Sequence, residues 1–269
     1  MESLYLPQHD AFVRWHRVGN GGPVVVWLPG IGFPAVGNFL ATATQNVLPQ
    51  IQSILIDPLG AGSSDASKMQ GLGISDQADV IAAVLDHLCH KSCFVLGYSM
   101  GGAIAAELTQ RRPDLVSRLI LAEGNLLTGG GAGTRSMVAV AAEEFRRESL
   151  PNMLAGLRTG ALNGDKVDDF ILSSWGHMDP DVLYEMAAAL IALRPELEQE
   201  ILNLTLPRWY IFGETNLTDP DTRNASNLPD PERLRAAGFA IRVLKGVGHD
   251  LMLSDPQGFA ALIAPALTP

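Results

Sequence analysis

The chain has 269 residues but only two cysteines, Cys89 and Cys93, so it offers no disulfide framework. It has no run of eighteen or more apolar residues, the length that a membrane-spanning helix requires. Its first residues, MESLYLPQHD, lack the basic region followed by an apolar stretch that marks a secretion signal. We therefore expect a cytoplasmic protein with reduced cysteines and no membrane partner.

Basic residues are also scarce. The chain has 19 Lys and Arg residues against 29 Asp and Glu residues, which gives a formal net charge of −10. This balance argues against nucleic acid or an anionic membrane surface as a partner. The composition, 47% hydrophobic and 18% charged, is that of a globular protein. We expect a monomer or homodimer whose partner is a small-molecule substrate.

The first half of the chain alternates between strand and helix patterns. Short apolar runs rich in β-branched residues predict buried strands at 23–30, 53–58, 92–97 and 118–123. Apolar residues at helical spacing predict a helix at 75–88 with Ser75 as its cap, and another at about 100–112. Such alternation predicts an α/β fold with a mostly parallel sheet flanked by helices.

The strand pattern is interrupted in the middle of the chain. From about residue 125 to 203 the composition is helical, and strands return at 208–213 and 240–246 before a closing helix at 256–267. We interpret residues 125–205 as a helical cap inserted into a core formed by 1–124 and 206–269. The glycine-rich stretch at 128–134 is the predicted hinge.

The segment VLGYSMGG, residues 95–102, places Ser99 between glycines where a predicted strand gives way to a predicted helix. This setting is typical of a nucleophile elbow, the sharp turn that exposes a reactive serine at the edge of a sheet. The N-terminus of the following helix favours negative charge as it develops. The other interpretation is a glycine-rich turn that only packs tightly.

Four segments together resemble the α/β-hydrolase family, in the family's order: WLPGIGF (27–33), DPLGAGSSD (57–65), GYSMGG (97–102) and GVGHDLM (246–252). The resemblance covers nearly the whole chain. It implies that Ser99 is a catalytic nucleophile. It also implies that 57–65 forms a tight surface turn that is either structural or at the rim of the pocket, and we assign it no chemistry.

The resemblance identifies His249 as the general base, because it matches the family's terminal histidine and follows the last predicted strand. His177 lies in the predicted cap, where it could face the substrate. His87 and His90 lie near the two cysteines, but their spacing matches no usual zinc pattern. We expect no metal and no cofactor.

Two residues are candidates for the acid of the triad. Triad order in this fold is serine, acid, histidine, and Asn216 stands where the family most often has aspartate. Asp219 follows closely and is one alternative. Glu123 ends the strand at 118–123, and zearalenone-lactone hydrolases of the family use a glutamate at a similar offset from the serine. We favour Glu123, because an ionisable residue that ends a buried strand is costly unless it is paired.

The resemblance also implies an oxyanion hole made by the backbone N–H groups of Ile31 and Met100. We expect substrate contacts from the loop after the first predicted parallel strand and from the cap. The residues concerned are Gly30, Gly32, Phe33, Trp175, His177 and Tyr184.

A serine at the elbow favours acyl chemistry. We expect hydrolysis of a carboxylic ester or lactone of a bulky apolar molecule through an acyl-enzyme. The alternatives within the same fold are a carbon–carbon bond hydrolase, an acyltransferase and a non-catalytic small-molecule receptor, since fold alone does not choose the function.

Overall fold

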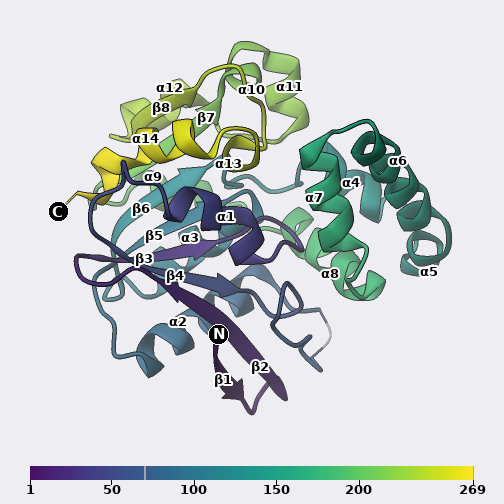
Figure 1. The fold of residues 1–269 in the computed structure, drawn as a ribbon, viewed down its shortest axis with the longest axis horizontal. Helices are drawn as coiled ribbons and strands as arrows, with labels where there is room; N and C mark the ends of the chain where they lie inside the picture. Colours follow the sequence, from purple (N-terminus) through teal and green to yellow (C-terminus); the bar gives the residue numbers. More distant parts are fainter. Residues whose placement is uncertain (70, 269) are drawn as a thin grey trace.

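The structure is a computed structural model that describes residues 1–69 and 71–268. Its centre is an eight-stranded sheet in the order β1-β2-β4-β3-β5-β6-β7-β8 (Figure 1). The strands are Glu2–Leu6 (β1), Ala11–Val18 (β2), Val24–Leu28 (β3), Gln52–Asp57 (β4), Cys93–Tyr98 (β5), Val116–Ala122 (β6), Arg208–Gly213 (β7) and Ala240–Leu244 (β8).

The six strands from β3 to β8 pair in parallel, whereas β1 pairs with β2 and β2 with β4 in antiparallel fashion. The predicted mostly parallel α/β sheet is therefore confirmed. The β1–β2 hairpin was not predicted. Its signal was nonetheless present, because Ala11, Val13 and Trp15 alternate with more exposed residues, the pattern of a strand with one buried face.

Helices cover both faces of the sheet. Val25, Trp27 and Leu55 pack on the face covered by α1 and α14, whereas Val26 and Ile54 pack on the face covered by α2 and α3. Among the described helices, none is both long and apolar enough to cross a membrane. The helices of the two layers are Ala35–Ala43 (α1), Ile74–His87 (α2), Met100–Arg111 (α3), Pro231–Ala236 (α12), Leu251–Ser254 (α13) and Pro256–Leu267 (α14).

Helix α2 begins one residue earlier than predicted, and the prediction that Ser75 caps it is wrong. Gly73 occupies the cap position, and its backbone N–H donates to the Asp76 carboxylate at 2.8 Å. Ser75 lies in the first turn. The acidic side chain therefore supplies the capping contact from within the helix, where it also complements the helix dipole.

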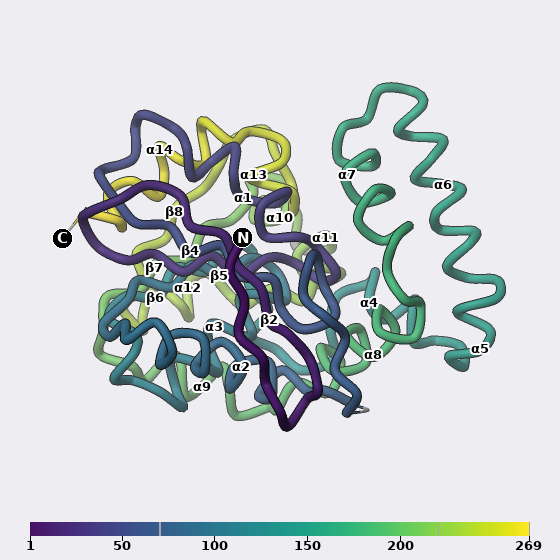
Figure 2. The backbone as a smooth tube through the Cα atoms, turned by 60° about the horizontal axis from the view of Figure 1, so that its bottom comes forward, coloured from purple at the N-terminus to yellow at the C-terminus, as the bar shows by residue number. Residues whose placement is uncertain are grey.

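Between β6 and β7 the chain forms only helices. Figure 1 shows α4 to α8 gathered beyond one end of the sheet, whereas α9 lies back against the sheet layer, where it contacts α3. In Figure 2 α6 and α7 stand side by side, away from the strands. We call residues 125–205 the insert; their status as a separate cap stays a prediction. Its helices are Ala132–Val138 (α4), Ala142–Glu144 (α5), the π-helix Phe145–Ser149 (η1), Leu150–Leu162 (α6), Lys166–Trp175 (α7), Pro180–Ile191 (α8) and Leu197–Leu202 (α9).

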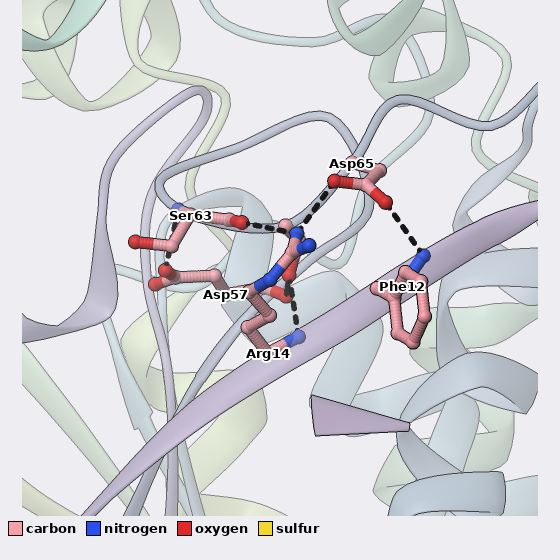
Figure 3. Close-up of polar contacts among 6 residues, drawn as sticks. Phe12, Arg14, Asp57, Ser63 and Asp65 are labelled. Atoms are coloured by element: carbon pink, nitrogen blue, oxygen red, sulfur yellow. Dashed lines mark hydrogen bonds and ion pairs between the residues drawn. The ribbon is translucent and has the colours of Figure 1, made fainter. Parts of the chain in front are cut away.

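The loop 57–65 is tied to β2 by a polar network (Figure 3). The Arg14 guanidinium donates to the Ser63 carbonyl and pairs with Asp65, whose carboxylate also accepts the Phe12 N–H. Asp57 is buried and accepts the N–H groups of Ser63 and Ala35, at 2.8 and 2.7 Å. Through the bond from the Ala35 N–H, Asp57 of this loop anchors the start of α1.

Candidate active site

The register of β5 and β6 brings Ser99 and Glu123 side by side. Tyr98 pairs with Ala122 at the ends of these neighbouring parallel strands, so the next residue of each lies at the carboxyl edge of the sheet. The Ser99 N–H donates to the Ala122 carbonyl at 3.1 Å. Two residues that are 24 positions apart in sequence thus become neighbours through strand pairing alone.

Ser99 has the strained backbone of an elbow, with φ of 51° and ψ of −119°. Residues other than glycine rarely adopt positive φ, so surrounding packing must hold this conformation. The glycines allow that packing. A Cβ on Gly97 would lie 2.2 Å from the Gly101 oxygen, and one on Gly101 would lie 2.1 Å from the Leu28 oxygen. The strand, turn and helix approach too closely for any side chain at these two positions.

His249 connects the serine to the glutamate. Its Nε2 lies 3.0 Å from Ser99 Oγ, and its Nδ1 lies 3.3 Å from Glu123 Oε2. The histidine side chain is 35% exposed, whereas the glutamate side chain is fully buried. The order along the contact chain is that of a serine, a base and an acid that orients the base.

The Glu123 carboxylate is surrounded by donors. Oε1 accepts the Gly213 N–H at 2.7 Å, and Oε2 accepts the Asn216 side-chain amide at 2.7 Å in addition to the histidine contact. Such charge-assisted bonds offset the cost of burying the carboxylate. Asn216 therefore holds the Glu123 carboxylate in place from the position where the family most often has aspartate. This contact was not predicted.

The charges around His249 favour its protonated form. Burial acts to lower the pKa of the imidazole, but the hydrogen bond and charge of Glu123, helped by the charge of Asp250, outweigh it. The pKa of His249 is therefore raised above its ordinary value. Glu123, which follows β6, and Asp250, which follows His249 in the chain, thus both raise the pKa of His249.

Asp219, the alternative acid, lies elsewhere. It is exposed at the N-terminus of Pro220–Ala225 (α11), where its carboxylate accepts the Asp221 N–H and the Thr222 hydroxyl. The short helix Glu214–Thr218 (α10) carries Asn216, not Asp219, toward the site. Of the two proposed acids, the structure brings only Glu123 to the histidine.

The N–H groups of Ile31 and Met100 are available as donors. Met100 opens α3, where the first N–H groups have no acceptor within the helix. Among the described contacts, none uses the N–H of either residue, whereas the Gly30 N–H donates to Asn38. The Ile31 carbonyl accepts the Trp175 indole N–H at 3.0 Å, so α7 is bonded directly to this loop.

A cavity of about 390 Å³ opens next to Ser99 and His249. It lies between the loop after β3, helices of the insert and α11, and its walls are largely apolar. The remaining lining residues are Ile31, Phe33, Tyr98, Asn125, Gly131, Ala132, Gly133, Thr134, Met137, Ile171, Trp175, Leu190, Thr222, Ala225, Ser226 and Asp250.

The cavity includes some of the expected substrate contacts and leaves out others. Phe33 and Trp175 line it, and Gly30 and Gly32 flank Ile31 without lining it. His177 is exposed between α7 and α8, away from the lining. Tyr184 is also outside the lining, since it packs against Phe145 and donates its hydroxyl to the Val140 carbonyl.

The lining residues that were not predicted include Tyr98, Asn125 and Asp250. The Tyr98 hydroxyl donates to the Asp250 carboxylate at 3.0 Å. Asp250 brings a carboxylate to the cavity, and among the described lining residues there is no Lys or Arg. Its position directly after His249 in GVGHDLM was the available sequence signal.

The residues flanking Cys89 do not form a metal centre. Within 1–69 and 71–268, no three His, Cys, Asp or Glu side chains are grouped as a metal site requires. Cys89 is exposed and Cys93 is buried in β5, both as free thiols. Burial raises the pKa of the Cys93 thiol to about 11, which leaves it protonated and unreactive.

This geometry agrees with a comparison against protein families. The alpha/beta hydrolase family matches residues 25–262, from the second residue of β3 into α14. The chain belongs to the alpha/beta hydrolase family. The eight-stranded sheet and its flanking helices are those of that fold.

Two solved structures resemble this alpha/beta hydrolase in fold, and one curated protein resembles it in sequence. A carboxylesterase of Nitrososphaera gargenis has the same fold, with a TM-score of 0.81 over 99% of this chain and 97% of its own, at 16% identity. The enol-lactonase of Burkholderia xenovorans LB400 has a TM-score of 0.76 over 99% and 100%, at 18% identity. The 2-hydroxy-6-oxononadienedioate/2-hydroxy-6-oxononatrienedioate hydrolase of Escherichia coli is 31% identical over 129 residues, which span 46% of this chain and 42% of the relative.

Proposed function

We propose that this alpha/beta hydrolase cleaves a carboxylic ester or lactone of an uncharged, largely apolar small molecule. Ser99 is the nucleophile, His249 is the general base and Glu123 orients the histidine. The observation that carries the proposal is the continuous contact chain from Ser99 Oγ through the imidazole to Glu123 Oε2, at 3.0 and 3.3 Å.

In the first half of the reaction, Ser99 Oγ attacks the carbonyl carbon of the substrate while its proton passes to His249 Nε2. The carbonyl oxygen becomes an oxyanion, which the N–H groups of Met100 and Ile31 stabilise. The intermediate then collapses. The carbon–oxygen bond to the alcohol breaks, and the alcohol oxygen takes the proton from the histidine. The acyl group remains as an ester on Ser99.

Water completes the cycle. His249 takes a proton from a water molecule as that water attacks the acyl-enzyme, and returns it to Ser99 Oγ when the ester bond breaks. The products are the carboxylic acid and the regenerated serine. Glu123 keeps Nδ1 protonated throughout, so that Nε2 can act as the base, and stabilises the imidazolium that forms.

The cavity favours an uncharged substrate. Its walls combine aliphatic and aromatic side chains, such as Met137, Ile171 and Trp175, with the carboxylate of Asp250. Carboxylate substrates are usually held by Arg or Lys, and none is among the described lining residues. A negatively charged substrate would lose its hydration and meet a like charge.

A carbon–carbon bond hydrolase is the second candidate, because of the Escherichia coli relative. The substrate in that relative's name is a dicarboxylate without an ester, so its hydrolysis must break a carbon–carbon bond. Two carboxylates require cationic partners, which the described cavity lining lacks. The charge of the cavity therefore favours the ester or lactone.

Hydrolysis assays decide between these functions. We expect turnover of p-nitrophenyl esters and of neutral lactones, better for larger apolar acyl groups than for acetate, and lost in Ser99→Ala. Turnover of a vinylogous diketone dicarboxylate with no ester turnover would establish the second candidate. Ester formation with an added alcohol would indicate an acyltransferase, and ligand binding without any turnover would indicate a receptor.

A further inference from the structure

His249 lies on a loop and has only a long contact with the acid. The loop, residues 245–250, joins β8 to α13, and the histidine side chain is partly exposed. Its Nδ1 is 3.3 Å from Glu123 Oε2, longer than the roughly 2.7–2.9 Å of a strong charge-assisted bond. A second restraint on this loop would help to keep Nε2 at its 3.0 Å from Ser99 Oγ.

Tyr98 is a rigid side chain directly beside the imidazole. It is the last residue of β5 and is fully buried. Its ring lies against that of His249, with 5.1 Å between the centroids and 39° between the planes. A Cβ on Gly30 would lie 2.9 Å from Tyr98 Cε1, so the loop after β3 closes tightly on the ring. Because Ser99 is the next residue in the chain, the tyrosine is fixed relative to the nucleophile.

The Tyr98 hydroxyl contacts the residue that follows the histidine. It donates to Asp250 Oδ1 at 3.0 Å, and burial raises the pKa of Tyr98 well above its ordinary value, so the donor keeps its proton. Asp250 occupies the cap position of α13, where an aspartate usually accepts a backbone N–H. Among the described contacts, however, its side chain makes no capping hydrogen bond. Helix capping therefore does not explain the aspartate.

Two adjacent residues of the elbow thus contact two adjacent residues of the loop. Tyr98 contacts Asp250 at 3.0 Å. Ser99 contacts His249, also at 3.0 Å. Because neighbours in a chain move together, the first contact restrains the geometry of the second. The second is the one along which the proton passes in the proposed mechanism.

We propose that Tyr98 is a positioning residue: its bond to Asp250 holds the loop against the elbow and keeps His249 Nε2 within reach of the serine proton. This inference rests on the proposed ester or lactone hydrolysis. Tyr98 itself takes up no proton, and it acts on the histidine through the neighbouring aspartate. A displacement of about 1 Å in a reacting group can cost on the order of 10²-fold in rate, so such a restraint affects kcat.

Two variants of Asp250 test this role. Asp250→Asn and Asp250→Ala both lose the charge, but only the asparagine keeps an oxygen that can accept the Tyr98 O–H. We compare their kcat and KM on p-nitrophenyl hexanoate, each with Tyr98 and with Tyr98→Phe, at a pH above the rise of the rate. Tyr184→Phe is the matched control, since it removes a hydroxyl that is also bonded at 3.0 Å but lies outside the cavity lining.

With Tyr98 present, Asp250→Ala should have a kcat about tenfold below that of Asp250→Asn, with KM values within about twofold of each other. With Tyr98→Phe, the two should have the same kcat, because the contact that distinguishes them is already lost. Tyr98→Phe alone should lower kcat, and Tyr184→Phe should leave it unchanged. Thermal unfolding of each variant checks that the fold is retained.

Equal kcat for the two Asp250 variants, or the same difference with Tyr98 and with Tyr98→Phe, would overturn the assignment while leaving the proposed hydrolysis intact. A change confined to KM would overturn it as well, because the hydroxyl would then contact the substrate instead of positioning the histidine. A wild-type protein without any ester or lactone turnover would contradict both the proposed function and this inference.

Discussion

At the scale of single residues, Glu123 is a buried side chain with three hydrogen-bonding partners. A buried carboxylate that accepts a backbone N–H, an asparagine amide and a histidine has its charge and its orientation fixed together. Asn216 cannot itself stabilise an imidazolium, but it holds the group that can. The proposed acid thus lies directly after β6, and its supporting donors come from the last residue of β7 and from α10.

We expect Glu123→Gln to lower kcat by a factor on the order of 10²–10⁴, because the amide keeps the size of the side chain but loses the charge that orients His249. Asp219→Asn is the matched control, since it neutralises an exposed carboxylate that caps α11, and should change kcat less than about threefold. Steady-state kinetics on one ester measures both. The reverse ranking would move the acid to the later loop.

Asp250→Asn should alter the pH profile of kcat/KM. The proposed mechanism requires neutral His249, so the rate should rise with pH as the imidazole loses its proton. The raised pKa should put that rise above the ordinary histidine range. Removing the Asp250 charge takes away one cause of the raised pKa, so the rise should move to lower pH. Glu123 stays in place in this variant. A shift to higher pH, or an equal shift in Asp219→Asn, would contradict this explanation.

At the scale of elements, α7 supports the loop that carries Ile31. The Trp175 indole N–H bonds to the Ile31 carbonyl, and its ring stacks on Phe33 at 6.1 Å between centroids. The same residue also lines the cavity. A helix of the insert therefore contributes to the position of a proposed oxyanion donor as well as to the cavity wall.

We expect Trp175→Phe to lower kcat about fivefold, because the stacking ring remains while one neutral hydrogen bond to the Ile31 loop is lost. Trp209→Phe changes an indole on β7 outside the cavity lining and serves as the control. Kinetics on the same ester compares the two. A change in KM alone would mean that Trp175 acts only as a wall of the cavity.

Elements with strong local patterns could be predicted, and those that depend on tertiary contacts could not. The strands around Ser99 have continuous apolar runs, and the glycines at 97 and 101 signal a close approach. The β1–β2 hairpin has a weaker alternating signal. The burial of Asn125 and the contact from Asn216 to Glu123 arise only when distant segments meet, so no local pattern announces them.

At the scale of the whole molecule, Arg194 joins the insert to the sheet layer. Its guanidinium contacts Glu107 of α3 and Glu200 of α9, each at 2.5 Å. The Glu107 side chain is 2% exposed. A carboxylate so deeply buried depends on its cationic partner, and this pair spans from the helix behind Ser99 to the segment after α8.

We expect Arg194→Met to lower the free energy of unfolding by about 2–3 kcal/mol, because Glu107 is left buried without its cation. Arg147→Met removes an exposed pair with Glu143 and should cost less than about 0.5 kcal/mol. Urea unfolding followed by tryptophan fluorescence measures both. Adding Glu107→Gln to Arg194→Met should recover part of the loss; no recovery would show that lost packing, not charge, is the cause.

The central claim is that Ser99 is a nucleophile activated by His249, and trapping a covalent adduct on the serine, phosphonyl or acyl, tests it most directly. The protein is incubated with a fluorophosphonate or a slowly hydrolysed ester, and intact mass spectrometry with peptide mapping locates the adduct. We predict one adduct per chain, on Ser99, lost in Ser99→Ala and strongly slowed in His249→Ala. Ester turnover by Ser99→Ala at the wild-type rate, or an adduct on any other residue, would contradict the account.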